Sequence, residues 1–459
     1  IEFARNGGRI NTDAIDNAGG VDSSDHEVNL KILLNQQVAA GILGESERNA
    51  LLESMTEEVA ELVLRHNYGQ SQILSLGETQ AASRLNDHRR LIHELENAGR
   101  LNRELEQLPS DEELDALARE GQGLSRPETA VLLAHSKLWL CDQLIDAGIA
   151  DDGDLLPLLR QYFPSAVREG FGTALEQHPL RTELLATHLT NQLCNRLGET
   201  FVSYLQSETR CSALEALRAC VSACRILGAD DLWRGLEAIE REIDDDLFRA
   251  QLGAIQDLIE RTALWLLRHT EETPASVVVF ADDIRDLLHA LPDLLDEEDA
   301  QAIKLERERL LVAGLQEPLA TSLARLPLLY PLLSLLSLSR SCGQMPATTA
   351  GLYFALEKAL QLKPMRHSIA LLPERDLWQR KARATLAREV DGAQLQLCRW
   401  ILECTDDGAA VERLAQWQSS AGARLDNLYQ TFAEIRSCDT PDLAMLSVAV
   451  RELGSLQAP

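Results

Sequence analysis

Aromatic residues and positive charge are scarce in this sequence. Phe, Trp and Tyr together make up 4% of the 459 residues, and 44 Lys and Arg stand against 72 Asp and Glu. Few aromatic residues disfavour β-sandwiches, whereas a sequence dominated by Leu and Ala favours packed helices. The net charge of −28 repels phosphate backbones and anionic lipids, and the sequence has no local basic patch. We therefore expect no binding to nucleic acid or to a membrane surface.

Long apolar runs and a disulfide framework are also missing. The most apolar stretch, residues 326–339, is shorter than the roughly 20 residues that cross a bilayer and contains Pro327 and Pro331. We predict that it is a core segment. The nine cysteines are scattered, and Cys220 and Cys224 are interpreted as small buried residues rather than metal ligands. With no recognisable signal peptide, these features predict a cytoplasmic protein in a reducing environment.

Helical patterns follow one another from about residue 44 to the end of the chain. Apolar side chains recur at spacings of three and four, which is typical of an amphipathic helix. Ser125 and Glu128 form a capping-box signature, with Pro127 in the first turn. Further helical patterns cover residues 51–67, 180–206, 212–227, 230–269 and 350–362. We predict breaks at 108–114, 271–276 and 339–349, and a possible short strand at 277–280.

Other polar groups are interpreted without a catalytic or metal-binding role. The acidic runs at 244–246 and 296–299 lack the spacing of a calcium loop, so they are predicted to be solvated. His26 lies between two acidic residues and is predicted to sit in a solvated first helical turn. His135 falls on the apolar face of its helix and is interpreted as a core histidine. The sequence thus predicts no metal ligand and no catalytic residue in this chain.

Residues 1–24 differ from the remainder of the chain, because they contain paired glycines and have no helical period. Gly19 and Gly20 are predicted to form a tight turn. Ser24 and Glu27 then form a second capping-box signature, so we predict that a helix begins at Ser24. Free amides and the positive end of a helix dipole make such a place suitable for an anionic group.

The same segment resembles the end of the nucleotide-binding domain of glutamate dehydrogenases. The likeness lies in NAGGV at residues 17–21, followed by a serine and a glutamate at Ser24 and Glu27. The wider context resembles the very large NAD-specific bacterial members of that family. Further stretches resemble successive parts of the C-terminal region of the same large subunit: 57–71, 124–140, 178–202 and 352–362.

This resemblance implies specific roles for residues at the front of the chain. Ser24 would hydrogen-bond the distal carboxylate of a dicarboxylate substrate, with Ser23 as a possible substitute, and Val21 would line the pocket beside the carbon chain. The nicotinamide side of the cofactor would lie near Asn17, Gly19 and Gly20. Ser24 could instead act only as a helix cap. Asp22 would be unfavourable near a substrate carboxylate unless its side chain points away.

The resemblance also implies a fold and a reaction. The expected fold is mainly α, with a long multi-helix C-terminal region preceded by the last edge of a Rossmann-like α/β nucleotide-binding domain. The expected domains are residues 1–43, 44–270 and 271–459. The implied reaction is oxidation of L-glutamate to 2-oxoglutarate and ammonia with NAD as cofactor. The resemblance further implies a homo-oligomer.

Most of the catalytic machinery of that family is missing from the sequence. The chain contains no GxGxxG turn between a strand and a helix, and the contexts of the catalytic lysines and aspartate are absent. The chain also opens at Ile1 rather than at a methionine. We therefore expect a piece of a longer polypeptide that cannot catalyse the reaction alone. The alternative is a non-catalytic helical scaffold, or an oligomerisation or regulatory module, that keeps an ancestral sequence.

Overall fold

The computed structural model describes residues 1–269, 274–291, 294–373, 377–405, 408–438 and 441–456, and these residues contain helices but no strand. The prediction of a mainly α fold is confirmed. The first residues, expected to form an edge of an α/β domain, are helical as well. The chain divides into two compact units, residues 1–274 and 275–459, which are described separately. The predicted boundaries at 43 and 270 remain predictions.

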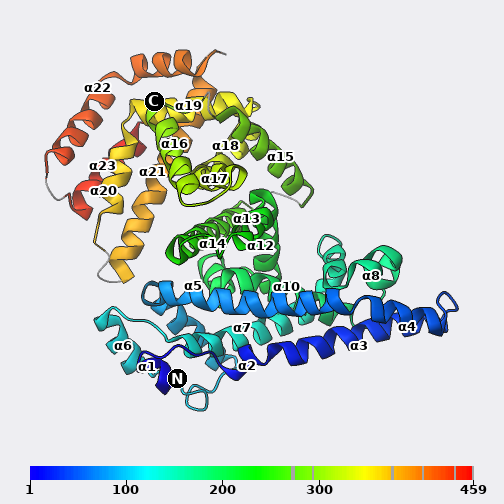
Figure 1. Cartoon of the computed structure of the whole chain (residues 1–459). Helices are drawn as coiled ribbons and strands as arrows, with labels where there is room; N and C mark the ends of the chain where they lie inside the picture. The colour runs from blue at the N-terminus through cyan, green and yellow to red at the C-terminus, as the bar shows by residue number, and fades with distance from the viewer. Residues whose placement is uncertain (270–273, 292–293, 374–376, 406–407, 439–440, 457–459) are drawn as a thin grey trace. The chain divides into compact units, whose positions relative to one another are not determined.

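The first unit is arranged around a very long helix, α5 (Thr56–Asn97). Helices α3 (Ala18–Ala39), α7 (Arg126–Asp146) and α10 (Arg181–Leu197) all pack against α5, and Figure 1 shows α3 running beside it. The remaining elements of the unit are α1 (Glu2–Arg5), α2 (Asp13–Asp16), α4 (Glu45–Ser54), α6 (Asp111–Glu120), the 3-10 helices η1 (Ile149–Asp151) and η2 (Leu156–Tyr162), α8 (Ser165–Gly170), α9 (Gly172–Glu176), α11 (Phe201–Thr209), α12 (Ala213–Leu227), α13 (Ala229–Ala238) and α14 (Asp245–Arg268).

The amphipathic patterns identify most of these helices, although several are interrupted. The predicted stripe at 51–67 spans the junction of α4 and α5 at Met55, which is 2% exposed. Gly198, with φ of 87°, separates α10 from α11 inside the predicted helix 180–206. The capping box at Ser125 and Glu128 is confirmed: the Glu128 carboxylate accepts a hydrogen bond from the Ser125 amide at 2.7 Å.

A leucine-rich core holds the end of α5 against α6 and the start of α7. Its members are almost fully buried and come from three helices and the loops between them, so their burial fixes the course of the chain around α5. The buried members are Leu85, Leu91, Ile92, Leu95, Leu101, Leu108, Leu114, Leu124 and Leu132.

The N-terminal segment is fixed to this framework by ion pairs. Arg5 on α1 donates to the Glu128 carboxylate on α7 at 2.6 Å. Arg126, which is 7% exposed, donates to Asn11 at 2.6 Å and to Glu78 on α5 at 3.0 Å. Because Arg126 is buried and its planar guanidinium bonds several partners at once, residues 1–16 are held firmly against α5 and α7.

The second unit consists of helices alone within its described residues. They are α15 (Pro274–Ala290), α16 (Glu297–Val312), α17 (Glu317–Ala324), α18 (Leu326–Cys342), α19 (Pro346–Ala359), α20 (Leu362–Ala370), α21 (Leu377–Cys404), α22 (Ala410–Arg436) and α23 (Leu443–Ser455). The possible strand at 277–280 is therefore wrong, because these residues lie inside α15. The predicted break at 339–349 is shorter than expected, since α18 continues to Cys342. Much of 271–276 lies outside the described residues.

The apolar segment at 326–339 forms most of α18, and seven of its leucines are buried in the second unit. The prediction of a core segment is confirmed. Among the described residues, no single helix is long and apolar enough to cross a membrane, and one bent pair, α17 with α18, meets the length and composition criteria together.

The acidic runs cap helices or face solvent, and the cysteines form no disulfides. Asp244 accepts hydrogen bonds from two amides at the start of α14, and Asp296 caps α16 and pairs with Lys363 at 3.0 Å. The remainder of the 244–246 run is exposed, as predicted, whereas Asp296 is partly enclosed. All nine cysteines are free, with Cys220 buried.

Candidate functional site

The segment that carries the family resemblance lies on helix α3, which begins earlier than the sequence predicts. Asn17 is the N-cap residue and Ala18 the first helical residue, so Gly19, Gly20 and Ser24 all lie inside the helix. The predicted glycine turn is wrong, and so is a helix start at Ser24. Ser24 is therefore not a helix cap. At its other end the helix closes at Ala39, and Gly41 follows with φ of 71°.

Four of the five predicted site residues share one exposed face of α3. Asn17, Gly20, Val21 and Ser24 follow the three- and four-residue spacing that aligns side chains along a helix. All four are exposed, Val21 by 72%. A face with an exposed valine and a free hydroxyl is open to a ligand or to another part of the protein. The structure thus brings these four residues together, whatever their role.

Gly19 is separated from this group and faces the interior. A Cβ atom added to Gly19 would lie 3.5 Å from Cγ1 of Val63 on α5. Gly19 therefore lies at the α3–α5 contact rather than beside the exposed face. The alternative serine, Ser23, donates its hydroxyl to the carbonyl of Gly19 at 2.7 Å.

The inner face of α3 carries a cluster of polar side chains. The Asp22 carboxylate lies 2.8 Å from Nδ1 of His66 on α5, and its second oxygen lies 3.8 Å from Nε2 of His26. Asp22 is nearly opposite Ser24 around the helix, since two residues correspond to about 200° of rotation. Its charge therefore points away from the exposed face, which removes the electrostatic objection raised by the sequence.

His26 is buried, so its interpretation as a solvated residue is wrong. Its imidazole is 1% exposed and stacks on the Tyr162 ring with centroids 4.3 Å apart. Burial lowers the pKa of His26, with Asp22 opposing this effect. The residue faces inward because α3 starts before it and places positions 19, 22 and 26 on the side that contacts α5.

Tyr162, at the end of η2, connects α3 to the middle of the unit. Its hydroxyl donates to the Asp25 carboxylate at 2.8 Å and lies 3.2 Å from the Asn29 amide nitrogen. Burial, followed by the charge of Asp25, raises the pKa of Tyr162. His178 approaches the Asn29 carbonyl oxygen at 3.2 Å. Through these contacts the inner face of α3 is fixed by elements far away in the sequence.

Two further titratable groups lie close to this cluster. His188 on α10 is 7% exposed, and burial lowers its pKa to about 3. Burial also lowers the pKa of Lys137 on α7 to about 8, opposed by charge interactions with Cys194 and Asp22. Sequence reasoning assigned no role to either residue. His135, interpreted as a core histidine, is only partly buried, and its Nδ1 lies 2.9 Å from the carbonyl oxygen of Arg100.

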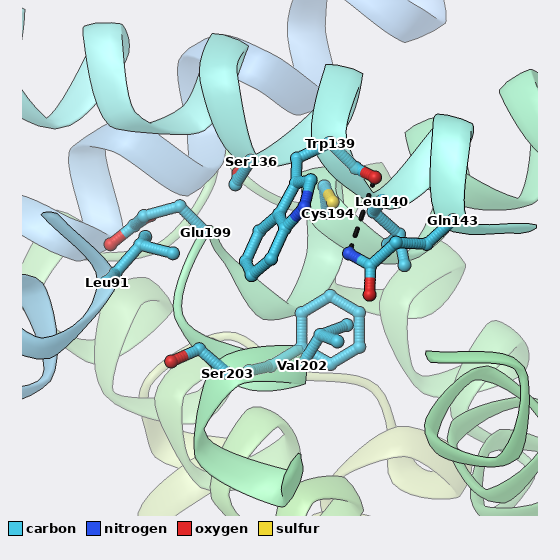
Figure 2. A pocket seen from close by; sticks show the side chains of 10 residues that line it. Leu91, Ser136, Trp139, Leu140, Gln143, Cys194, Glu199, Val202 and Ser203 are labelled. Atoms are coloured by element: carbon cyan, nitrogen blue, oxygen red, sulfur yellow. Dashed lines mark hydrogen bonds between the residues drawn. The ribbon is translucent and has the colours of Figure 1, made fainter. Parts of the chain in front are cut away.

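A small cavity in the first unit is unsuited to a substrate. Figure 2 shows Trp139, Gln143 and Val202 around it, and its volume is about 10 Å³. That is barely enough for one water molecule. This cavity therefore cannot hold a dicarboxylic acid or a nicotinamide ring.

Two known families match parts of this chain. The family described as "Glutamate dehydrogenase, C-terminal" matches residues 121–455. The chain belongs to this glutamate dehydrogenase family. A second family, "Bacterial NAD-glutamate dehydrogenase, catalytic domain", matches residues 1–77, which include α3 and the first half of α5. The exposed face of α3 thus lies in the part that matches the catalytic domain of the glutamate dehydrogenases.

Three curated relatives are called NAD-specific glutamate dehydrogenase. The protein from Pseudomonas aeruginosa is 36% identical, and those from Halomonas elongata and Mycobacterium tuberculosis are each 34% identical. Each alignment covers 99% of this chain but 28% of the relative. The chain therefore spans a little more than a quarter of the length of these glutamate dehydrogenases.

The described residues fit no more than one edge of an NAD molecule. Asn17 and Gly20 are exposed and could contact a cofactor, whereas Gly19 is turned toward Val63. The chain has no glycine-rich phosphate-binding turn. NAD would supply the hydride acceptor, and the groups that bind its phosphates would have to come from outside this chain.

Sequence reasoning missed the partners of the inner face of α3. Asp22 and His26 are four residues apart, a spacing that already places them together on a helix. His66 and Tyr162 come from distant elements, and no local signal predicts their approach. Helical spacing alone could have identified the Asp22–His26 pair, had the helix start been placed at Ala18.

Proposed function

We propose that this chain is part of an NAD-dependent glutamate dehydrogenase that converts L-glutamate to 2-oxoglutarate and ammonia. The chain contributes one edge of the substrate pocket, through α3, and a large helical region that supports it. The observation that carries this proposal is the alignment of Asn17, Gly20, Val21 and Ser24 on one exposed helix face. The relatives named NAD-specific glutamate dehydrogenase support the assignment.

In this proposal Ser24 donates its hydroxyl to the distal carboxylate of glutamate. The hydroxyl is free for this task because Ser24 is exposed and does not cap the helix. A hydroxyl holds a carboxylate without adding a titratable group, so this contact would not itself depend on pH near neutrality. Val21 would pack against the carbon chain of the substrate. Asn17 and Gly20 would border the nicotinamide.

The experiment is a kinetic comparison of two neighbouring serine variants in the polypeptide that also carries the catalytic domain. Ser24→Ala removes a hydrogen bond to a charged group, worth about 1.5–3 kcal/mol, so we expect the KM for glutamate to rise roughly tenfold or more. Ser23→Ala is the control, because its hydroxyl is bonded to the Gly19 carbonyl. Equal KM values for Ser24→Ala and the unmodified enzyme would refute the substrate role of Ser24.

We also propose that the complete enzyme is a homo-oligomer in the cytoplasm. The family resemblance supports assembly. The nine free cysteines are compatible with a reducing compartment. In this arrangement the catalytic chemistry resides in the remaining sequence of the polypeptide, and the helical region supplies a rigid support for α3.

A further inference from the structure

Three side chains of metal-ligand type converge on the inner side of α3. Asp22 and His26 lie one turn apart on that helix, and His66 approaches from α5. One candidate ligand atom from each residue can be chosen so that all three lie within 4.8 Å of one another. The Asp22 carboxylate is the central member, 2.8 Å from His66 and 3.8 Å from His26.

The second observation is an unsatisfied histidine. His26 is 1% exposed, and neither of its ring nitrogens has a hydrogen-bond partner among the described residues. Buried polar atoms are nearly always paired, so an interior imidazole with two free nitrogens requires an explanation. Stacking on Tyr162 accounts for the position of the ring, but it leaves Nε2 facing Asp22 without a bond.

We propose that Asp22, His26 and His66 bind a divalent transition-metal cation of the zinc class, which links α3 to α5. This proposal is independent of the enzymatic activity proposed above. Two imidazoles and one carboxylate suit Zn²⁺ or Co²⁺, whereas Mg²⁺ and Ca²⁺ prefer oxygen ligands. Three protein ligands leave a fourth position for water.

The three ligand atoms must move closer together to bind one ion. In a tetrahedral zinc site with bonds of about 2.0–2.1 Å, neighbouring ligand atoms lie roughly 3.3 Å apart. The two separations from Asp22, 2.8 and 3.8 Å, belong to different carboxylate oxygens, whereas a set of one ligand atom per residue lies within 4.8 Å. His26 is buried, while the side chains of Asp22 and His66 are 20% and 21% exposed. An ion can therefore reach the site from the side of these two residues.

Lys137 carries a positive charge that opposes the binding of a cation at the proposed site. Lys137 interacts electrostatically with Asp22, but it forms no ion pair within 4.0 Å in the part of the chain that the structure describes. A cation bound to Asp22 would be repelled by the Lys137 ammonium. Replacing Lys137 by methionine should therefore tighten metal binding. If Asp22 binds no metal and its charge is only balanced by Lys137, the same variant should gain no affinity for metal.

The test uses the untagged chain, freed of metal with a chelator and titrated with Co²⁺ and Zn²⁺. We expect one equivalent of Co²⁺ to bind and to give the visible absorption of a four- or five-coordinate ion without a thiolate charge-transfer band. Asp22→Asn and His66→Gln should weaken binding by at least about 100-fold, because the loss of mere outer-shell partners already costs 10–100-fold. Zn²⁺ should raise the melting temperature of the unmodified chain but not that of Asp22→Asn or His66→Gln.

Two further variants make the result decisive. His93→Gln is the matched control, because His93 pairs with Asp111 at 3.0 Å on the surface but is not part of a three-ligand group. This variant should retain full affinity. His26→Phe keeps a ring to stack on Tyr162 while removing the ligand nitrogens, and circular dichroism verifies that it is folded. The proposal is overturned if the chain binds no stoichiometric Co²⁺, if a thiolate band appears, or if His66→Gln binds as tightly as the unmodified chain.

Discussion

Lys137 carries an ammonium group in a place where charge is unfavourable. Burial lowers its pKa from 10.5 to about 8, so the folded protein binds this proton less tightly than the unfolded chain does. Between about pH 8 and pH 10.5 the unfolded state therefore holds more protons. By linkage, the contribution of Lys137 to stability becomes more favourable as pH rises through this window. Below pH 8 the buried, protonated lysine destabilises the folded state by the full amount, up to about 3 kcal/mol at 1.36 kcal/mol per pKa unit.

We accordingly predict that Lys137→Met stabilises the chain at pH 7, by up to about 3 kcal/mol. The gain should shrink as pH rises from 8 and become small above about pH 10.5, where the lysine loses its proton in the unfolded state as well. Urea unfolding at several pH values in chelator-containing buffer measures this effect. Lys31→Met, at an exposed position on α3, is the control and should change stability by no more than about 0.5 kcal/mol. A destabilised Lys137→Met variant would show that the amine has a favourable partner.

The Ser-x-x-Glu signature predicts the start of some helices correctly, but it does not predict the start of α3. The Ser-x-x-Glu signature at Ser125 correctly marks the start of α7, and Ser110 begins α6 in the same way. The identical signature at Ser24 lies inside α3. The difference is tertiary, because Gly19, Asp22 and His26 meet α5 and extend the helix backward across the paired glycines. The contact between α3 and α5 cannot be predicted from the sequence alone.

Those glycines provide a prediction at the level of the helix. Gly20 has helical geometry, and a Cβ atom there would lie 3.5 Å from Oδ1 of Asn17, an ordinary contact. Gly20→Ala should therefore stabilise the chain by about 0.5–1 kcal/mol through a more ordered helix. Denaturant unfolding measures the change. Gly121→Ala is the contrasting variant and should destabilise, because Gly121 ends α6 with φ of 68°. If Gly20→Ala also destabilises, the helical start at Ala18 is wrong.

The candidate site was only partly predictable for the same reason. The resemblance named five residues, and four of them share one face: Asn17, Gly20, Val21 and Ser24. The resemblance could not identify the residues behind that face. The approach of His66 and Tyr162 to α3 depends on how α5 and η2 pack, and this is determined by burial of side chains far apart in the sequence.

At the scale of the whole chain, composition and periodicity predicted the helical class, whereas the course of the chain required the structure. Scarce aromatic residues and recurring apolar stripes indicated helices throughout. Interruptions such as Met55 and Gly198 divide these stripes into separate helices, and the sequence gives only weak signals for them. The second unit illustrates this limit, because VVVF at 277–280 has strand-like composition and is helical.

The two units predict two unfolding steps. Each has its own buried core, for example Leu91 and Ile92 in the first and Leu332 and Leu336 in the second. Units with separate cores generally unfold as separate cooperative blocks. Differential scanning calorimetry should show two transitions, and Lys137→Met should move only the one belonging to the first unit. A single transition whose calorimetric and van't Hoff enthalpies agree would contradict this expectation.

Helix α3 has a practical consequence for hybrids between related dehydrogenases. Its outer side carries the residues that we propose to contact glutamate, and its inner side contacts His66 and Tyr162, which lie much later in the chain. A crossover placed between α3 and α5 would join Asp22 from one parent to His66 from another. Recombination of catalytic and helical parts should therefore keep residues 17–162 from a single parent, so that both sides of α3 are inherited together.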